Sequence, residues 1–352
     1  RLYHGIRVDW GCIQHVIRCT NETASVGEDM SRLPVEQLFA AFDGAVPGAS
    51  ALLLRNGEPV LTLAFGLADL ESQMPATPTT NYRLASVSKQ FTAMATLQLV
   101  SDGKLRLEDS LARFFADSPA YWRHITIQQL LTHTSGLPDY EDLIPPDATT
   151  QVHDEDVLEL VRTQSSGYFA PQTAYRYSNT AYCLLALIIA QVAGQRFPSF
   201  LQERIFAPLG MHATVAHQEG ISVVPQRAYG HSLRDGVWQR TDQSVTSATL
   251  GDGGIYSSVV DLARWDTALA EGTLLPQHLM QALFTPHVAI PNGESYGFGW
   301  YLRGQHLAYH TGDTIGFRTA IVRLLDLRAT AVVLVNRSDA NPLELAEALL
   351  LS

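Results

Sequence analysis

A serine and a lysine three residues apart carry the first chemical signal in this sequence. Ser86 and Lys89 form a Ser-x-x-Lys pattern that opens an apolar run containing Phe91, Met94 and Leu97. If this run is a helix, Ser86 and Lys89 share one face, and Ser86 lies at the positive N-terminal end, where an oxyanion is favoured. A serine becomes a strong nucleophile only when a neighbouring base takes its proton. The pattern therefore predicts that Ser86 is acylated and that Lys89 helps to activate it.

Lys89 acts as this base only if its pKa falls from about 10.4 to nearer 7, a change of about 4 kcal/mol. Burial beside an apolar helix shifts a lysine pKa in this direction. The alternative is an ordinary surface lysine, and Ser-x-x-Lys alone does not exclude it. A second copy runs from Ser101 to Lys104, but its Asp102-Gly103 pair breaks the helical turn that would bring the two side chains together. We therefore reject the second copy on geometry.

A tyrosine and an asparagine form the second candidate element. Tyr177-Ser178-Asn179 lies in a loop before the apolar helix expected at 181–192. A tyrosine hydroxyl beside Lys89 can relay a proton, and Asn179, two residues on, can hold a substrate amide. The alternative, a capped helix start with a packed tyrosine, is favoured when this motif stands alone.

The third element is His310-Thr311-Gly312, within strands expected towards the end of the chain. Here Gly312 lets a substrate backbone approach closely, and Thr311 offers a hydroxyl to a carboxylate or carbonyl. The alternative is a strand that ends in a turn. The three elements occur in one fixed order along the chain, which makes the set more specific than any one of them.

The three motifs together resemble those of the serine β-lactamase and penicillin-binding-protein superfamily. The resemblance is closest to the branch of class C β-lactamases, low-molecular-weight DD-peptidases and β-lactamase-fold esterases, and it spans about residues 31–340. The further segments that carry it are 84–92, 130–137, 253–258, 261–265 and 296–300. It implies an oxyanion hole made by the backbone N–H groups of Ser86 and Asp313, and a structural role for His133. The implied two-step acyl transfer requires no metal and no organic cofactor.

One departure from the family pattern affects the expected activity. Class C β-lactamases usually carry Lys where this chain has His310, and a histidine with a pKa near 6.5 is only partly charged at pH 7. We therefore expect weak or pH-dependent anchoring of a substrate carboxylate. The expected function is a serine hydrolase acting on an amide, lactam or ester carbonyl. An esterase-like, DD-peptidase-like or aminopeptidase-like enzyme with little β-lactamase activity is one alternative, and a penicillin sensor that is acylated without turnover is another.

Other catalytic motifs are absent from the sequence. The nearest approach to Gly-x-Ser-x-Gly, at 230–234, ends in Arg234 and fails at that position. No His-Glu-x-x-His or paired-cysteine pattern occurs. The acidic segment 153–156 is interpreted as a solvated helix start and not as a metal site.

Composition bounds the remaining possibilities. The chain has 352 residues and a formal net charge of −11, which disfavours nucleic acid as a partner. A small molecule or peptide with a scissile carbonyl is the expected partner.

No segment reaches the roughly 18–20 apolar residues of a membrane span, and no signal peptide is visible in residues 1–30. The sequence assigns neither the cellular compartment nor the oligomeric state. A periplasmic or secreted location is implied only by the resemblance.

The pattern of apolar residues predicts an α+β fold. Residues 50–55 and 60–65 flank Asn56-Gly57, a strong hairpin signal, and further strands are expected at 306–310, 318–325 and 329–335. We expect an antiparallel sheet of about five strands from both chain ends, flanked by terminal helices near Ser31 and at 342–352. The expected division is a tail at 1–30, a sheet lobe at 31–85 and 296–352, and a mostly helical lobe at 86–295, which together form one functional unit.

Overall fold

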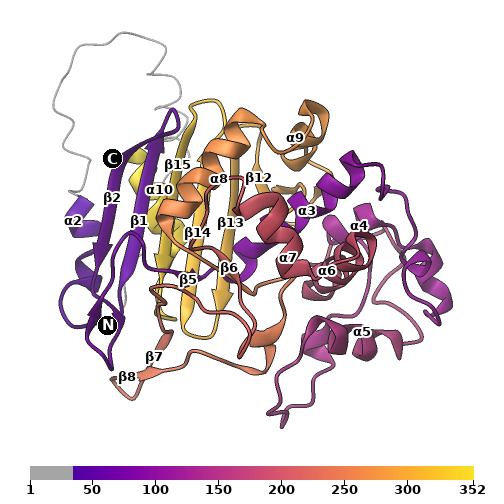
Figure 1. Ribbon diagram of the computed structural model, residues 1–352, viewed down its shortest axis with the longest axis horizontal. Helices are drawn as coiled ribbons and strands as arrows, with labels where there is room; N and C mark the ends of the chain where they lie inside the picture. Colours follow the sequence, from indigo (N-terminus) through magenta and orange to yellow (C-terminus); the bar gives the residue numbers. More distant parts are fainter. Residues whose placement is uncertain (1–34) are drawn as a thin grey trace.

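An eight-stranded antiparallel sheet forms the centre of the computed structural model, which describes residues 35–352 (Figure 1). Its strand order is β10-β11-β12-β13-β14-β15-β1-β2, so the first and the last long strands of the chain lie beside one another. The long strands are β1 (Ala49–Arg55), β2 (Glu58–Phe65), β13 (Leu307–Thr314), β14 (Phe317–Leu324) and β15 (Ala329–Val335). The short strands are β10 (Val288–Ala289), β11 (Ser295–Tyr296) and β12 (Tyr301–Arg303).

The five expected strands are all present, and the sheet is larger than expected. Asn56 and Gly57 both have positive φ, 53° and 83°, as a two-residue hairpin turn requires, and they join β1 to β2. The additional strands β10, β11 and β12 have two or three residues each, which is too short for an alternating pattern to be read from the sequence.

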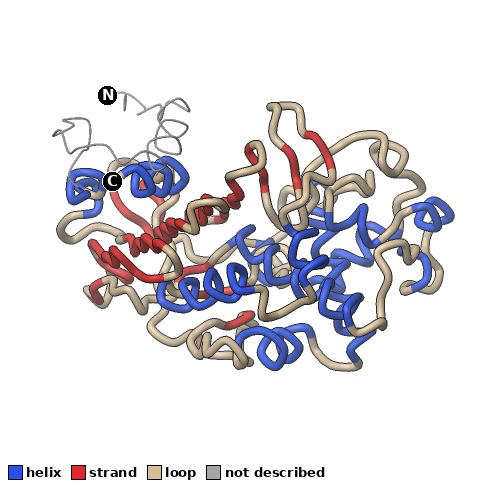
Figure 2. Tube along the Cα trace, turned by 90° about the horizontal axis from the view of Figure 1, so that it is seen from above, coloured by secondary structure: helices blue, strands red, loops and turns tan. Residues whose placement is uncertain are grey.

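Helices cover both faces of this sheet, as Figure 2 shows from above. On one face, η1 (Ala40–Phe42) and the closing helix α10 (Pro342–Leu351) pack against strand residues such as Leu53. On the other face, α8 (Val259–Glu271) and the helical region contact residues such as Leu52. Because both faces are covered, β1 and β15 are apolar without alternation, and residues 49–54 and 329–335 are all buried.

The expected start of the first helix near Ser31 and the tail at 1–30 lie outside the described residues; the first described helix is α2 (Val35–Leu38). The remaining α-helices are α3 (Lys89–Ser101), α4 (Ile127–Leu131), α5 (Asp154–Arg162), α6 (Asn179–Ala193), α7 (Phe197–Leu201) and α9 (Gln277–Leu283). Shorter turns are η2 (Ala85–Ser88), η3 (Leu111–Arg113), η4 (Ala120–His124), η5 (Tyr140–Asp142), η6 (Gln202–Phe206) and η7 (Val245–Ala248).

Three small sheets accompany the central one. They are β3 (Leu67–Asp69) with β4 (Met74–Pro75), β5 (Tyr82–Arg83) with β9 (Ile255–Ser257) and β6 (Val215–Ala216), and β7 (His231–Arg234) with β8 (Val237–Arg240). Four of these strands, β6 to β9, fall within residues 86–295, which the sequence pattern predicted to be mostly helical. The pairing of β5 with β9 matters most, because it brings two distant segments together just before Ser86.

Within residues 35–352, no single helix has both the length and the apolarity to cross a membrane, whereas the bent pair Asn179–Ala193 and Phe197–Phe206 passes that test when taken together.

Candidate active site

The turn that presents Ser86 is held between two sheets. Strand β5 leads directly into η2, and the Leu84 amide donates to the carbonyl of Ile255 at 2.8 Å. Ala85 has a positive φ of 49°, a strained backbone for a residue with a Cβ. In the 3₁₀ turn that follows, residues three apart eclipse, which places Ser86 and Lys89 together.

Lys89 lies at the centre of the site and has no exposed surface. Its Nζ is 2.9 Å from Ser86 Oγ, 2.8 Å from Asn179 Oδ1 and 2.9 Å from the carbonyl oxygen of Asp252. Burial lowers the pKa of Lys89 below its usual value, and the nearby Asp252 carboxylate opposes part of that shift. The sign is the one that a general base requires, because burial favours the neutral amine.

The loop before α6 places Asn179 and Tyr177. Asn179 is the first residue of α6, and its amide donates to Asp139 Oδ2 at 2.7 Å. The Ser178 amide donates to His133 Nδ1 at 3.0 Å, and the His133 ring stacks on Tyr177 at 4.4 Å between centroids. The His133 side chain therefore holds this loop by a hydrogen bond to the loop backbone, in keeping with the structural role that the resemblance implies.

Tyr177 lies against Lys89, with Nζ 4.9 Å from the ring centroid. Its buried hydroxyl has no hydrogen-bond partner within the described part of the chain. Burial raises the pKa of Tyr177 well above its usual value, and the neighbouring Tyr301 adds to the shift. The phenol is therefore neutral at pH 7.

Gly312 lies at a close contact within the protein. A Cβ at this position would lie 2.1 Å from the Leu84 carbonyl oxygen and 2.3 Å from Thr319 Oγ1. Thr319 Oγ1 also donates to the Leu84 carbonyl oxygen at 2.7 Å. The missing side chain thus lets β13 pack against the turn that carries Ser86. The expected approach of a substrate backbone at Gly312 stays a prediction. Thr311, one residue earlier, is partly exposed on the same strand.

His310 is buried and faces the protein instead of a substrate. Its Nδ1 is 2.7 Å from the Thr311 carbonyl oxygen, so Nδ1 carries the proton, and Nε2 accepts from the Tyr296 hydroxyl at 3.1 Å. Burial lowers the pKa of His310 to about 3, with a further contribution from the charge of Lys89. The expectation of a partly charged His310 that anchors a carboxylate at neutral pH is therefore wrong.

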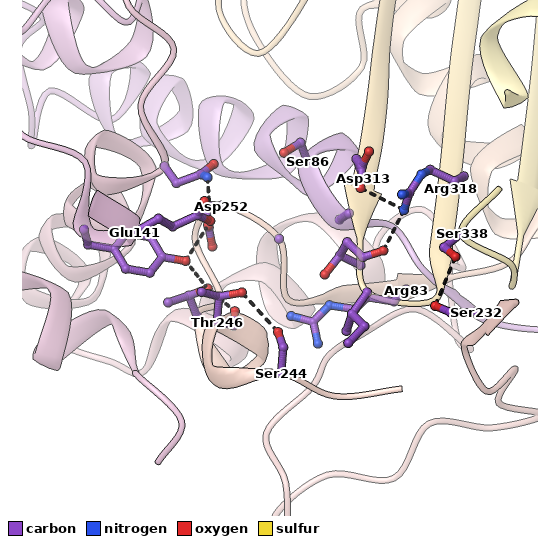
Figure 3. A pocket seen from close by; sticks show the side chains of 17 residues that line it. Arg83, Ser86, Glu141, Ser232, Ser244, Thr246, Asp252, Asp313, Arg318 and Ser338 are labelled. Carbon is purple, nitrogen blue, oxygen red and sulfur yellow. Dashed lines mark hydrogen bonds and ion pairs between the residues drawn. The ribbon is translucent and has the colours of Figure 1, made fainter. Parts of the chain in front are cut away.

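A cavity of about 410 Å³ opens beside Ser86 (Figure 3). Ser86 and Asp313, the two residues expected to supply the oxyanion-hole amides, both line it. The sequence analysis missed four charged residues on its wall: Arg83, Glu141, Asp252 and Arg318. The position of Arg83, three residues before Ser86, is a signal in the sequence that points to one of them.

The acidic segment 153–156 does begin helix α5, but Asp154 is buried and not solvated. Its carboxylate accepts from the Leu250 amide at 3.1 Å and the Gly251 amide at 3.3 Å. Burial raises the pKa of Asp154 to about 7. Its carboxylate, the Cys183 thiol and the Asp252 carboxylate lie within 4.8 Å of one another, a geometry that could accommodate a metal ion. The contacts that are present make Asp154 a support for the segment whose Asp252 carbonyl binds Lys89.

Comparisons with known proteins relate this chain to one family. The family model described as Beta-lactamase matches residues 35–351. A penicillin-binding protein of Bacillus subtilis (strain 168) is 32% identical over 327 residues, which covers 87% of this chain and 70% of the relative. The structure of a penicillin-binding protein from Bacillus halodurans has a TM-score of 0.79 and 26% identity, with 90% of this chain and 98% of that one covered. A D-amino acid amidase from Ochrobactrum anthropi SV3 has a TM-score of 0.76 and 25% identity, with coverage of 90% and 96%.

Proposed function

This chain belongs to the beta-lactamase family, and we propose that it is a serine hydrolase that cleaves an amide or ester carbonyl through an acyl-enzyme on Ser86. The observation that best supports the proposal is the contact of 2.9 Å between Lys89 Nζ and Ser86 Oγ, with Lys89 fully buried. In the neutral lysine this contact reverses its direction, so that the serine hydroxyl donates to the amine.

In the first step, Ser86 Oγ bonds to the carbonyl carbon and its proton passes to Lys89 Nζ. The oxyanion that forms faces the backbone N–H groups of Ser86 and Asp313. The bond from the carbonyl carbon to the leaving group then breaks as neutral Tyr177 gives its proton to the leaving group, and Tyr177 is reprotonated from Lys89. In the second step, water bonds to the acyl carbon and its proton passes through the same groups to Ser86 Oγ. The bond between Oγ and the acyl carbon breaks, so the acid leaves and Ser86 is restored. Asn179 Oδ1 and the Asp252 carbonyl keep Lys89 Nζ in place throughout.

The environment of His310 is evidence that the β-lactamase activity of this protein is low. A neutral histidine with both ring nitrogens engaged inside the protein provides no positive charge for the carboxylate of a β-lactam. Esters and amides that lack this carboxylate bind equally well whether position 310 is the usual Lys or the His310 of this chain. The proposed substrates are therefore esters or amides, in the manner of an esterase or peptidase.

Glu141 favours amino-acyl amides among these substrates. Its Oε1 accepts from Asn179 Nδ2 at 3.0 Å, and no Lys or Arg of the described segment pairs with it. It lies at the exposed edge of the cavity beside Ser86, where a carboxylate would bind the ammonium group of an amino-acyl substrate. The similar amidase acts, by its name, on D-amino acid amides, which carry such a group next to the carbonyl.

The test combines turnover with intact mass. The purified protein is mixed with a chromogenic cephalosporin and, separately, with p-nitrophenyl butyrate. We expect ester turnover, little cephalosporin turnover and a transient acyl adduct. Ser86→Ala removes both the adduct and the turnover, and Lys89→Ala lowers turnover by about 10²- to 10⁴-fold, the usual contribution of a general base.

The chain offers its own matched controls in the rejected copy of the motif. Ser101→Ala and Lys104→Ala remove the same groups from the end of α3, where they are exposed, and we expect normal turnover from both. Rapid cephalosporin hydrolysis would identify a β-lactamase instead. An adduct that persists for hours without turnover would identify a sensor, and the absence of any adduct on Ser86 would refute the nucleophile assignment.

A further inference from the structure

The cavity beside Ser86 has charges of opposite sign on different walls. Figure 3 shows Glu141 and Asp252 on one side and Arg83 and Arg318 on the other, with Ser86 above them. Such a cavity recognises the charge pattern of a substrate as well as its scissile bond. The two arginines differ in what surrounds them, and this difference identifies the one that is available to a ligand.

Arg318 is already neutralised within the protein. Its Nη1 lies 2.8 Å from Asp313 Oδ1 and donates to the carbonyl oxygens of Thr314 and Phe317, also at 2.8 Å. A ligand carboxylate at Arg318 would therefore have to compete with Asp313. The positive charge of Arg318 is thus already paired with the carboxylate of Asp313.

Arg83 has no such partner. It is only 2% exposed, its Nη2 donates to the Ser247 carbonyl oxygen at 2.7 Å, and its Nε has no hydrogen-bond partner among residues 35–352. No carboxylate of this part of the chain lies within ion-pair distance of it. A buried guanidinium without a counter-charge is unfavourable, and its planar fork of N–H donors matches a carboxylate. Arg83 lines the cavity beside Ser86, which gives an anion access to it.

The position of Arg83 in the chain links it rigidly to the nucleophile. Strand β5 ends at Arg83 and the 3₁₀ turn with Ser86 begins two residues later. Strand β9 contacts both, because it pairs with β5 and its Ile255 amide donates to Ser88 Oγ in the turn. The backbones of Arg83 and Ser86 are therefore fixed relative to one another, and both side chains line the same cavity. A substrate group bound at Arg83 lies in the cavity where Ser86 meets the scissile carbonyl.

We propose that Arg83 is a specificity-determining residue that binds a carboxylate on the acyl part of the substrate, a few carbons from the scissile carbonyl. This inference rests on the proposed acyl-enzyme function and names the class of acyl donor that it takes. The preferred substrates are amides or esters of dicarboxylic acids, or amino-acyl derivatives with an acidic side chain. Arg83 acts in binding and takes no part in proton transfer.

The test compares matched p-nitroanilides in the intact protein. The mono-p-nitroanilides of succinic, glutaric and adipic acid are measured against those of butyric, pentanoic and hexanoic acid, which have the same number of carbons and no charge. We expect at least one charged member to exceed its neutral partner in kcat/KM by about 10- to 100-fold, the usual range for a hydrogen-bonded charge. A preference below twofold at every length would overturn the proposal.

Variants then assign the preference to one side chain. In Arg83→Gln the ratio of charged to neutral substrate falls towards one, and Arg83→Lys restores part of it. Arg106→Gln removes the same charge from an exposed position outside the cavity, and its ratio stays at the wild-type value. If Arg83 only supported the fold, Arg83→Gln would lower activity on both substrates equally and keep the ratio, which would overturn the proposal.

A binding measurement separates this inference from the proposed function. In Ser86→Ala, where acylation is impossible, calorimetry should show the charged p-nitroanilide binding at least tenfold more tightly than its neutral partner. Equal affinities would overturn the inference even if Ser86-dependent turnover of p-nitrophenyl butyrate supported the hydrolase. Tighter binding of the charged compound without turnover by the wild type would support Arg83 and count against the hydrolase. This comparison needs no variant of Arg83, so it stands even if those variants fold poorly.

Discussion

Gly312→Ala tests whether the packing of β13 against the nucleophile turn sets the position of Ser86. The new Cβ would lie 2.1 Å from the Leu84 carbonyl oxygen, whereas real Cβ atoms rarely come closer than 3.0 Å, so the two must separate by 3.0 − 2.1, or about 0.9 Å. Gly312 does not have positive φ, so the backbone itself accepts alanine. The effect therefore comes from this contact and from the hydrogen bond of Thr319 to the same carbonyl.

Two results are expected from this separation. Overpacking costs about 1–3 kcal/mol of unfolding free energy. A displacement of about 1 Å at the nucleophile lowers turnover by roughly 10²-fold. The loss should appear in kcat, because the turn that carries Ser86 has moved. If Gly312 served the approach of a substrate backbone instead, KM would rise and stability would not change.

The assay is steady-state hydrolysis of p-nitrophenyl butyrate together with urea unfolding. Gly253→Ala is the matched control, because a Cβ at Gly253 faces the same turn but lies 3.6 Å from its nearest atom, Ala85 C, an ordinary contact. We expect its free energy of unfolding to be unchanged and its kcat to stay within about twofold of the wild-type value. Normal stability and normal kcat in Gly312→Ala would refute the reasoning.

Three further predictions concern titrating groups. Because His310 is neutral above a pKa of about 3, His310→Gln should leave the shape of the pH–rate profile between pH 5.5 and 8 unchanged, and the loss of an acid limb near pH 6.5 would contradict this. Burial raises the pKa of Asp154 to about 7. The folded protein therefore keeps a proton on Asp154 that the unfolded chain releases near pH 4. As a result, the contribution of Asp154 makes the folded protein less stable as the pH rises from 4 to 7. Urea unfolding of Asp154→Asn against wild type should show this pH-dependent difference, with a slope of up to about 1.4 kcal/mol per pH unit, and a constant difference would count against it. Glu141→Gln should lower kcat/KM for D-alanine p-nitroanilide by about 2- to 5-fold relative to its N-acetyl form, as an exposed ion pair allows, and an unchanged ratio would exclude Glu141 as the ammonium site.

The sequence predicted the parts of the site that side-chain type and local spacing determine. Asn56-Gly57 marks the first hairpin because few dipeptides adopt two positive φ values. Ser86 and Lys89 come together because a single helical turn separates them. The association of this pair with Tyr177 and Asn179 came from the family resemblance, because nothing local relates segments that lie about 90 residues apart.

The remaining features depend on burial and on backbone atoms, which leave little trace in a sequence. The third acceptor for Lys89 is the carbonyl of Asp252, a group that every residue carries. His310 differed from the expectation because desolvation, and not residue type, decides its charge. Asp154 lies in a run of acidic residues that looks solvated, and Glu155 and Asp156 are indeed exposed, yet Asp154 itself is buried.

The pairing of β1 with β15 sets the order in which the protein becomes active during synthesis. The register joins Ala49 to Val335, so this part of the sheet closes only when the last strands have been made. Ser86 is translated 233 residues before Thr319, whose hydroxyl holds the nucleophile turn, a delay of roughly 10–50 s at 5–20 residues per second. Until Thr319 has been made, the turn that carries Ser86 lacks the hydrogen bond that holds it. We therefore expect Ser86 to react only in chains that have completed this part of the sheet.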